Sequence, residues 1–229
     1  TRLKLPVPPG FTITTEVCKK YYENNKKLPK TLMAEVKKNI AKIEKKTGKK
    51  WNSESNPLLV SVRSGAAISM PGMMDTILNL GLNDKTVTGL ADKSGNVRFA
   101  WDSYRRFIQL FGKVVFGVDD KKFDNILEDA KKKQNVEADS ELNEESLRKI
   151  VEQYKHVCEQ HTGKQFPSNP TEQLELAIKA VFSSWMGERA IVYREKNNIT
   201  KDIADGTGVN VVSMAFGNMG NDSATGVVF

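Results

Sequence analysis

The sequence contains little cysteine and little histidine. Its 229 residues include two Cys and two His. Cys18 and Cys158 lie far apart, with no further Cys or His at metal-ligand spacing, which excludes a disulfide-rich scaffold and a zinc site of the finger type. His156 and His161 fall in one predicted helix, where we expect them at the surface or near the helix end. The scarcity of Cys favours a reducing compartment, and we expect a cytoplasmic protein.

Long apolar runs and the common nucleotide-binding and hydrolase motifs are also missing. No run approaches the roughly 18 apolar residues of a membrane-spanning helix, so we expect no membrane association. The Gly-x-x-x-x-Gly-Lys-Ser/Thr and Gly-x-Gly-x-x-Gly patterns and a nucleophile elbow do not occur, which argues against P-loop, Rossmann and serine hydrolase chemistry. The first residues lack a Met and an apolar signal region, so we expect neither a secretory signal nor the natural start of the chain.

Positive charge is concentrated near the beginning. Residues 1–50 hold fourteen Lys and Arg against four Glu, whereas residues 51–229 hold twenty-one basic and twenty-four acidic residues, and the whole chain carries a net charge of +7. The lysines come in pairs between apolar positions at helical spacing, which predicts solvated helix faces rather than a nucleic-acid partner. A basic nucleic-acid-binding module remains an alternative, which predicts binding that weakens steeply with salt.

The order of patterns predicts an α+β protein. Short strands are expected near 11–14 and 58–62, and periodic apolar positions predict helices, the second of them ended by Gly48. Residues 63–75 read as a loop. The last segment predicts a hairpin of strands 209–216 and 223–229 around a Gly/Asn turn. The expected helices cover residues 15–22, 32–47, 101–115, a charged hairpin within 117–163, 171–185 and 188–197.

Arg63 is the first candidate for chemistry. It ends the apolar strand and is followed by small residues, hydroxyls and a Pro-Gly turn. A permanent cation beside backbone N–H groups and hydroxyls can bind an anion, and phosphoryl transfer depends on positioning and charge neutralisation. A surface ion pair is the alternative role for such an arginine.

Several segments together resemble one enzyme family. The run SVRSGAAISMPGMMDTILNLGLND at residues 61–84 is similar to the characteristic sequence of the pyruvate, phosphate dikinase family, and further segments match that family in the same order. Within this run, the sequence of residues 69–75 favours the phosphate-dependent family over related dikinases that use water as the second acceptor. Water-using dikinases such as phosphoenolpyruvate synthase remain an alternative. The further segments are residues 6–15, 98–109, 180–185 and 216–220.

The resemblance implies a fold, a reaction and partners. It implies part of an ATP-grasp nucleotide-binding domain with a helical insertion, divided into an N-terminal subdomain (1–115), a helical subdomain (116–200) and the start of a second lobe (201–229). The family transfers a phosphoryl group from ATP through a phosphohistidine to pyruvate, and so interconverts ATP, pyruvate and phosphate with AMP, phosphoenolpyruvate and diphosphate. The expected partners are ATP, the phosphohistidine domain and the pyruvate-binding barrel of a full-length homodimer.

The resemblance also assigns the site residues. Arg63 corresponds to the phosphate-contacting arginine, expected to be catalytic, and Arg106 to a second arginine at the ATP site. Arg106 lies about 200° around its helix from the apolar Tyr104, since each residue turns a helix by about 100°. The loop 69–75 is expected to cover the phosphates, and the backbone of 213–215 to line the adenine cleft. The residues expected to bind ATP are Arg63, Arg106, Ser69, Met74, Ser213, Met214 and Ala215.

Some family features differ or are missing. Val212 stands where glutamine is usual, and Ala67 where some members have arginine. The Gly-Gly-Lys-Gly loop and the acidic and glutamine side chains that hold Mg²⁺ do not occur, so the Mg²⁺ ligands are expected outside this segment. Because phosphoryl charge would then be incompletely neutralised, the segment alone is not expected to turn over ATP.

Overall fold

The chain combines eight α-helices with a four-stranded sheet. A computed structural model describes residues 6–66, 68, 70, 72–220 and 222–226, and the helices and strands lie within these ranges. The strands are β1 (Gly10–Ile13), β2 (Val60–Gly65), β3 (Thr76–Leu80) and β4 (Gly208–Ser213). The helices are α1 (Thr15–Glu23), α2 (Leu32–Thr47), α3 (Thr86–Ser94), α4 (Val97–Phe111), α5 (Asp120–Gln134), α6 (Glu144–Thr162), α7 (Pro170–Ser184) and α8 (Glu188–Lys196), with a π-helical turn η1 (Gly112–Phe116) and a 3₁₀ turn η2 (Asp139–Glu141).

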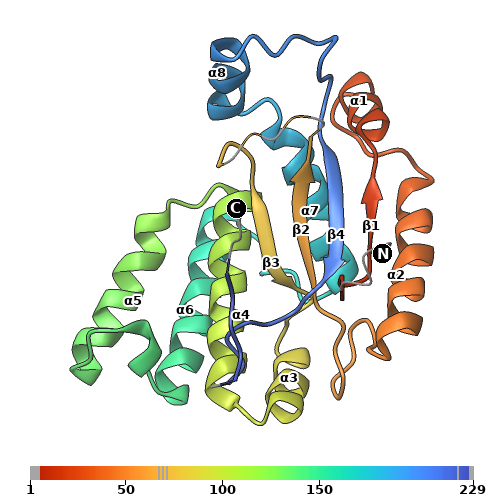
Figure 1. Cartoon of the computed structure of the whole chain (residues 1–229). Coiled ribbons are helices and arrows are strands. Elements are labelled where there is room, and N and C mark those ends of the chain that lie inside the picture. Colours follow the sequence, from red (N-terminus) through yellow and green to blue (C-terminus); the bar gives the residue numbers. More distant parts are fainter. Residues whose placement is uncertain (1–5, 67, 69, 71, 221, 227–229) are drawn as a thin grey trace.

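The sheet brings the two ends of the chain together. Its strand order is β1-β4-β2-β3, and all neighbours are antiparallel. β4 therefore lies between β1 and β2 (Figure 1). The predicted hairpin is wrong for the described residues, because β4 pairs with these two strands and residues 223–226 form no strand.

The two faces of the sheet differ in burial. Val60, Val62, Ile77, Val209 and Val211 are buried on one face, which α7 covers from behind in Figure 1. The opposite face, called the outer face below, carries alternating side chains that are exposed or half-exposed. These are Thr12, Ser61, Arg63, Thr76, Leu78, Asn210 and Val212.

One continuous apolar core joins the sheet to most of the helices. It extends from Val36 of α2 through Val62 of β2 to Phe107 of α4 and Tyr154 of α6. α4 runs beside β3, and α6 packs on the other side of α4 (Figure 1). The expected helical character of residues 116–200 is confirmed, and so is the α+β class. The division at 115/116 and 200/201 stays a prediction.

Two elements escaped the sequence patterns. β3 and α3 occupy part of the segment between the expected loop and the helix α4. The expected end of α2 at Gly48 is confirmed, since this residue caps the helix in the left-handed conformation at φ 70°, and Gly163 caps α6 in the same way at φ 69°. The two histidines are exposed, and His161 contacts the carbonyl of Phe116.

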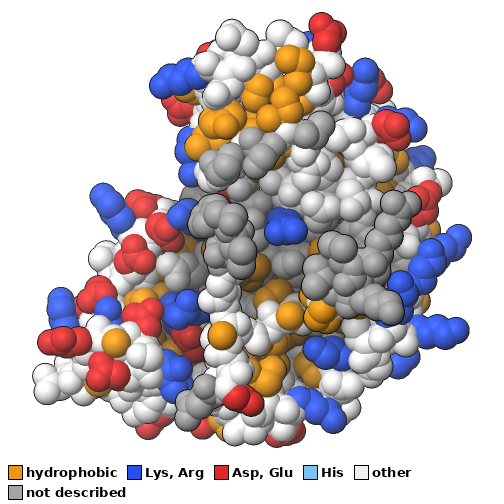
Figure 2. Space-filling view, in the orientation of Figure 1, with side chains coloured by type: hydrophobic (Ala, Val, Ile, Leu, Met, Phe, Trp, Pro, Cys, Tyr) orange, Lys and Arg blue, Asp and Glu red, His pale blue; other side chains and the backbone are white. Residues whose placement is uncertain are grey.

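The surface agrees with the charge pattern. The lysine pairs at 19–20, 37–38 and 45–46 are exposed on α1 and α2. Within the described part of the chain, no helix has the length and apolarity needed to cross a bilayer. Hydrophobic side chains reach the surface at the α8 end (Figure 2), where Met186 and Ile203 are exposed.

Candidate functional site

Arg63 lies on the outer face of the sheet. It is exposed on β2, opposite Thr76 of β3 and Asn210 of β4. The arginine ion pairs found among the described residues are those of Arg105, Arg106, Arg148 and Arg189, so Arg63 has no acidic partner there. The alternative role for Arg63, a surface ion pair, is therefore absent from the described part of the structure.

Polar groups of three strands surround this arginine. The hydroxyl of Thr12 donates to Oδ1 of Asn210 at 2.7 Å, and Nδ2 of Asn210 donates to the carbonyl of Ser64 at 3.4 Å. Gly65 leaves room for the Asn210 side chain in this hydrogen bond, because a Cβ atom at residue 65 would lie 2.5 Å from Nδ2 of Asn210. The outer face thus presents a row of hydrogen-bonded polar side chains, Thr12 and Asn210, that ends beside the exposed Arg63.

The loop after β2 is anchored by methionines. Met70 is buried in a small apolar cluster with Trp185, and Met74 packs against the same cluster half-buried. Ser69 lies outside the described residues, as does Ala67. Asp75, at the end of the loop, lies 3.8 Å from Arg189, and burial raises the pKa of its carboxyl. The described part of the loop is therefore attached to the α7–α8 end of the molecule.

Arg106 projects outward from α4. Its side chain is 53% exposed, whereas Tyr104 is buried, as the helical spacing predicted. It lines a cavity of about 380 Å³ together with Leu78. Leu78 shares the outer face with Thr76, the residue opposite Arg63. The two predicted arginines therefore both lie on elements that adjoin β3, Arg106 on α4 and Arg63 on β2.

The predicted adenine segment is only partly free. The amide of Ser213 donates to the carbonyl of Pro9, and that of Met214 donates to the carbonyl of Leu59, both at 2.9 Å. Ala215 is exposed, and its amide has no backbone acceptor within the described residues. Of the three residues, Ala215 has the amide that remains available to a base. Val212, the departure from the family pattern, is half-exposed on the outer face.

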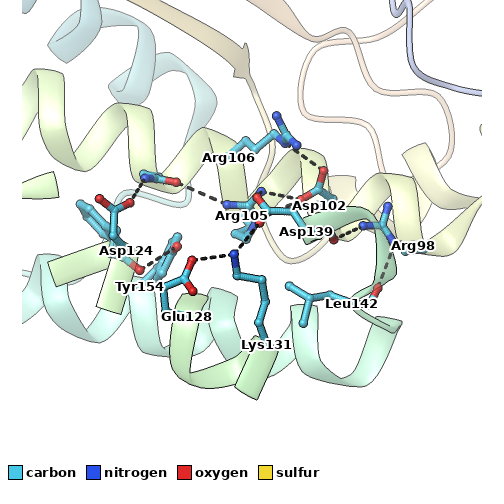
Figure 3. Close-up of polar contacts among 12 residues, drawn as sticks. Arg98, Asp102, Arg105, Arg106, Asp124, Glu128, Lys131, Asp139, Leu142 and Tyr154 are labelled. Atoms are coloured by element: carbon cyan, nitrogen blue, oxygen red, sulfur yellow. Dashed lines mark hydrogen bonds and ion pairs between the residues drawn. The ribbon is translucent and has the colours of Figure 1, made fainter. Parts of the chain in front are cut away.

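An ion-pair network that the sequence did not reveal lies behind Arg106. Oδ1 of Asp102 accepts from Nε and Nη2 of Arg105 at 2.9 and 2.7 Å, and Asp139 of η2 lies 3.4 Å from the same guanidinium. Burial lowers the pKa of Arg105, but Asp102 raises it, and the net shift is upward. Figure 3 shows Lys131 joining the network. The i,i+3 spacing of Asp102 and Arg105 permitted such a pair, but only tertiary structure shows that it is buried.

Potential metal ligands are scattered in the described part of the chain. Among the residues that the structure describes, no group of three or more His, Cys, Asp and Glu side chains could hold a metal ion.

Comparisons with known proteins bear on the family to which the chain belongs. The family profile described as "Pyruvate phosphate dikinase, AMP/ATP-binding domain" matches residues 25–229. The chain is 57% identical to the pyruvate, phosphate dikinase of Entamoeba histolytica and 53% identical to that of Giardia intestinalis, over 100% of its own length. It is 53% identical to the chloroplastic enzyme of Flaveria pringlei over 98% of its length. It spans 26%, 26% and 23% of these three relatives. The chain belongs to the AMP/ATP-binding domain family of pyruvate phosphate dikinases.

Proposed function

We propose that this chain is the ATP-binding part of a pyruvate, phosphate dikinase. The full-length enzyme would transfer a phosphoryl group from ATP through a phosphohistidine to pyruvate, with phosphate as the second acceptor. The observation that carries the proposal is the family match over residues 25–229. The exposed Arg63 on the outer face supplies matching chemistry, because a free guanidinium can bind phosphate oxygens bidentately.

The proposed site lies across the outer face of the sheet, within an ATP-grasp fold. Arg63 would neutralise charge on the transferred phosphoryl group, and Arg106 would act from α4, the helix that adjoins β3. The loop with Ser69 and Met74 would cover the phosphates. The adenine would lie against residues 213–215, where Ala215 offers its amide. Positioning and charge neutralisation are the contributions that phosphoryl transfer requires of the protein.

The remaining chemistry is assigned to other parts of a longer chain. Mg²⁺, when bound, would neutralise phosphate oxygens, with ligands outside this segment. The proposed partners are ATP, a phosphohistidine domain and a pyruvate-binding barrel. A homodimeric assembly and a cytoplasmic location stay predictions. The family match favours this proposal over a nucleic-acid-binding module, and a requirement for free phosphate separates it from a water-using dikinase.

Arg63→Leu in the full-length enzyme tests the proposal. We expect phosphorylation of the histidine by ATP to slow by about 100-fold or more, because loss of one group that stabilises developing charge costs on that order. Exchange between pyruvate and phosphoenolpyruvate should continue at the normal rate. The two half-reactions are measured separately by isotope exchange.

The control is Lys149→Leu on α6, where the side chain is exposed and paired with Glu145. This variant should leave both half-reactions unchanged. Equal loss of both half-reactions in Arg63→Leu would contradict the assignment of Arg63 to the ATP site.

A further inference from the structure

One carboxylate on α4 contacts two consecutive arginines. Oδ1 of Asp102 accepts two hydrogen bonds from Arg105, and Oδ2 accepts one from Nε of Arg106 at 2.9 Å. In Figure 3, Arg106 lies on the opposite side of this carboxylate from Lys131 and Glu128. Asp102 is therefore shared between a buried network and an outward-facing cation.

Burial changes sharply across this contact. The side chains of Arg105 and Asp102 are 3% and 8% exposed, whereas that of Arg106 is 53% exposed. A charge pair with a buried partner is screened less by water and salt than a pair on the surface. The Asp102–Arg106 contact should consequently hold its geometry better than an ordinary exposed helical ion pair.

The carboxylate itself is held in place. Arg105 bonds to it twice and also lies 3.4 Å from Asp139, and Gln109 accepts from Arg105 at 3.4 Å. Rotation of Asp102 would leave the buried guanidinium without its main partner, which is costly. The orientation of Oδ2 toward Arg106 is thus set by the buried side of the network.

The bond to Arg106 uses only one edge of its guanidinium. Nε donates to Asp102, while the terminal Nη1 and Nη2 groups have no hydrogen-bond partner within the described residues. A guanidinium that donates through Nε can still offer its terminal N–H groups to an anion. Arg106 also lines a cavity whose other walls include Leu78, the basic Lys113 and the three aspartates at 120, 124 and 139.

We propose that Asp102 is a positioning residue, which holds Arg106 in the orientation used for phosphoryl transfer from ATP. This inference rests on the proposed function, because it assigns Asp102 a role only through Arg106. The effect of Asp102 on the reaction arises from the fixed direction of the neighbouring cation.

A double-mutant cycle in the full-length enzyme tests this role. The variants are Asp102→Asn, Arg106→Met and the two combined, and the measured quantity is the rate of histidine phosphorylation by ATP. We expect Asp102→Asn to lower kcat about tenfold or more with less than about a threefold change in KM for ATP, since misplacing a group costs mainly the chemical step. In the Arg106→Met background, Asp102→Asn should cost less than about twofold, because the two residues act as one unit.

The outcomes distinguish the inference from the proposed function. If both single variants slow the reaction and their effects multiply in the combined variant, Asp102 does not act through Arg106 and the inference is overturned alone. If Arg106→Met leaves the ATP half-reaction unchanged, the proposed role of Arg106 fails together with the inference. An unchanged rate in Asp102→Asn, with a slow Arg106→Met variant, also overturns the inference.

Two further variants guard against a purely structural effect. Glu144→Gln removes the acid of another i,i+4 pair, with Arg148 on α6, and should leave the rate unchanged. Asp102→Glu retains the charge opposite Arg105 and should recover part of the rate lost in Asp102→Asn. If Asp102→Asn does not fold, the cycle is run with Asp102→Glu, whose partial loss should also vanish when Arg106 is Met.

Discussion

Adjacent arginines on one helix have opposite environments in this chain. Arg105 is buried with Asp102, while Arg106 is mostly exposed. Helical spacing predicted correctly that Arg106 turns away from the face of Tyr104, because this depends only on the helix turn. The burial of Arg105 was not predicted, since it requires Asp139 to approach from a separate turn.

The thiols give a prediction at the scale of single residues. Cys18 and Cys158 are fully buried and unpaired. Burial raises the pKa of both thiols, that of Cys158 to about 12. The thiolate is the reactive form, so at pH 8 both should react with a disulfide reagent roughly 100-fold more slowly in the folded chain than in denaturant.

The comparison is made by following thiol release spectroscopically with and without denaturant. A Ser140→Cys variant adds an exposed thiol in η2 and should show one fast-reacting group. A fast native reaction in the unmodified chain would contradict the burial of these cysteines.

At the scale of elements, the local sequence pattern predicted most of the helices but missed the helix α3 and the strand β3. α3 contains Gly89 and two threonines, which have low helix propensity, so the pattern gave no helix there. Its Gly89 lies so close to the backbone near Glu54 and Pro57 that the packing requires the absence of a side chain. β3 was missed because Asn79 adopts a left-handed conformation at φ 60°, where the register to β2 shifts.

Gly89→Ala tests the packing of α3. In an isolated helix this change stabilises by about 1 kcal/mol, but here the new Cβ would lie 2.3 Å from the carbonyl oxygen of Glu54. We expect the steric conflict to dominate and to lower the free energy of unfolding by about 1–3 kcal/mol. Denaturant titration of the 229-residue chain measures the change.

Thr88→Ala on the exposed side of the same helix is the matched control. It should alter the free energy of unfolding by no more than about 0.5 kcal/mol, as is usual for surface substitutions. A stabilised Gly89→Ala variant would show that the contact to Glu54 relaxes without cost.

At the scale of the whole molecule, the core connects the predicted subdomains. Residues from α2, the sheet, α4, α6 and α7 belong to one buried apolar cluster. β4, near the end of the sequence, is paired on both sides by strands from the first part of the chain. Unfolding of the helical segment would expose apolar surface of α4 and therefore weaken the sheet.

This continuity predicts one cooperative unfolding transition for the 229-residue chain. Trp51 hydrogen-bonds to Thr171 of α7, and Trp101 lies buried on α4, so their fluorescence reports on different parts of the core. We expect fluorescence and far-ultraviolet circular dichroism to give coincident denaturation curves. Loss of the circular dichroism signal at a lower denaturant concentration than the fluorescence change would contradict the prediction.

The sequence by itself determined most helices, the α+β class, the family and the outward direction of Arg106. These depend on local periodicity and on the order of residues along the chain. Only the tertiary structure decided that β4 lies between β1 and β2, that Arg105 is buried against Asp102, and that the elements carrying Arg63 and Arg106 both adjoin β3. Strand partners and buried charge pairs join residues distant in sequence, and many such pairings satisfy the same local pattern, so packing of the whole chain selects among them.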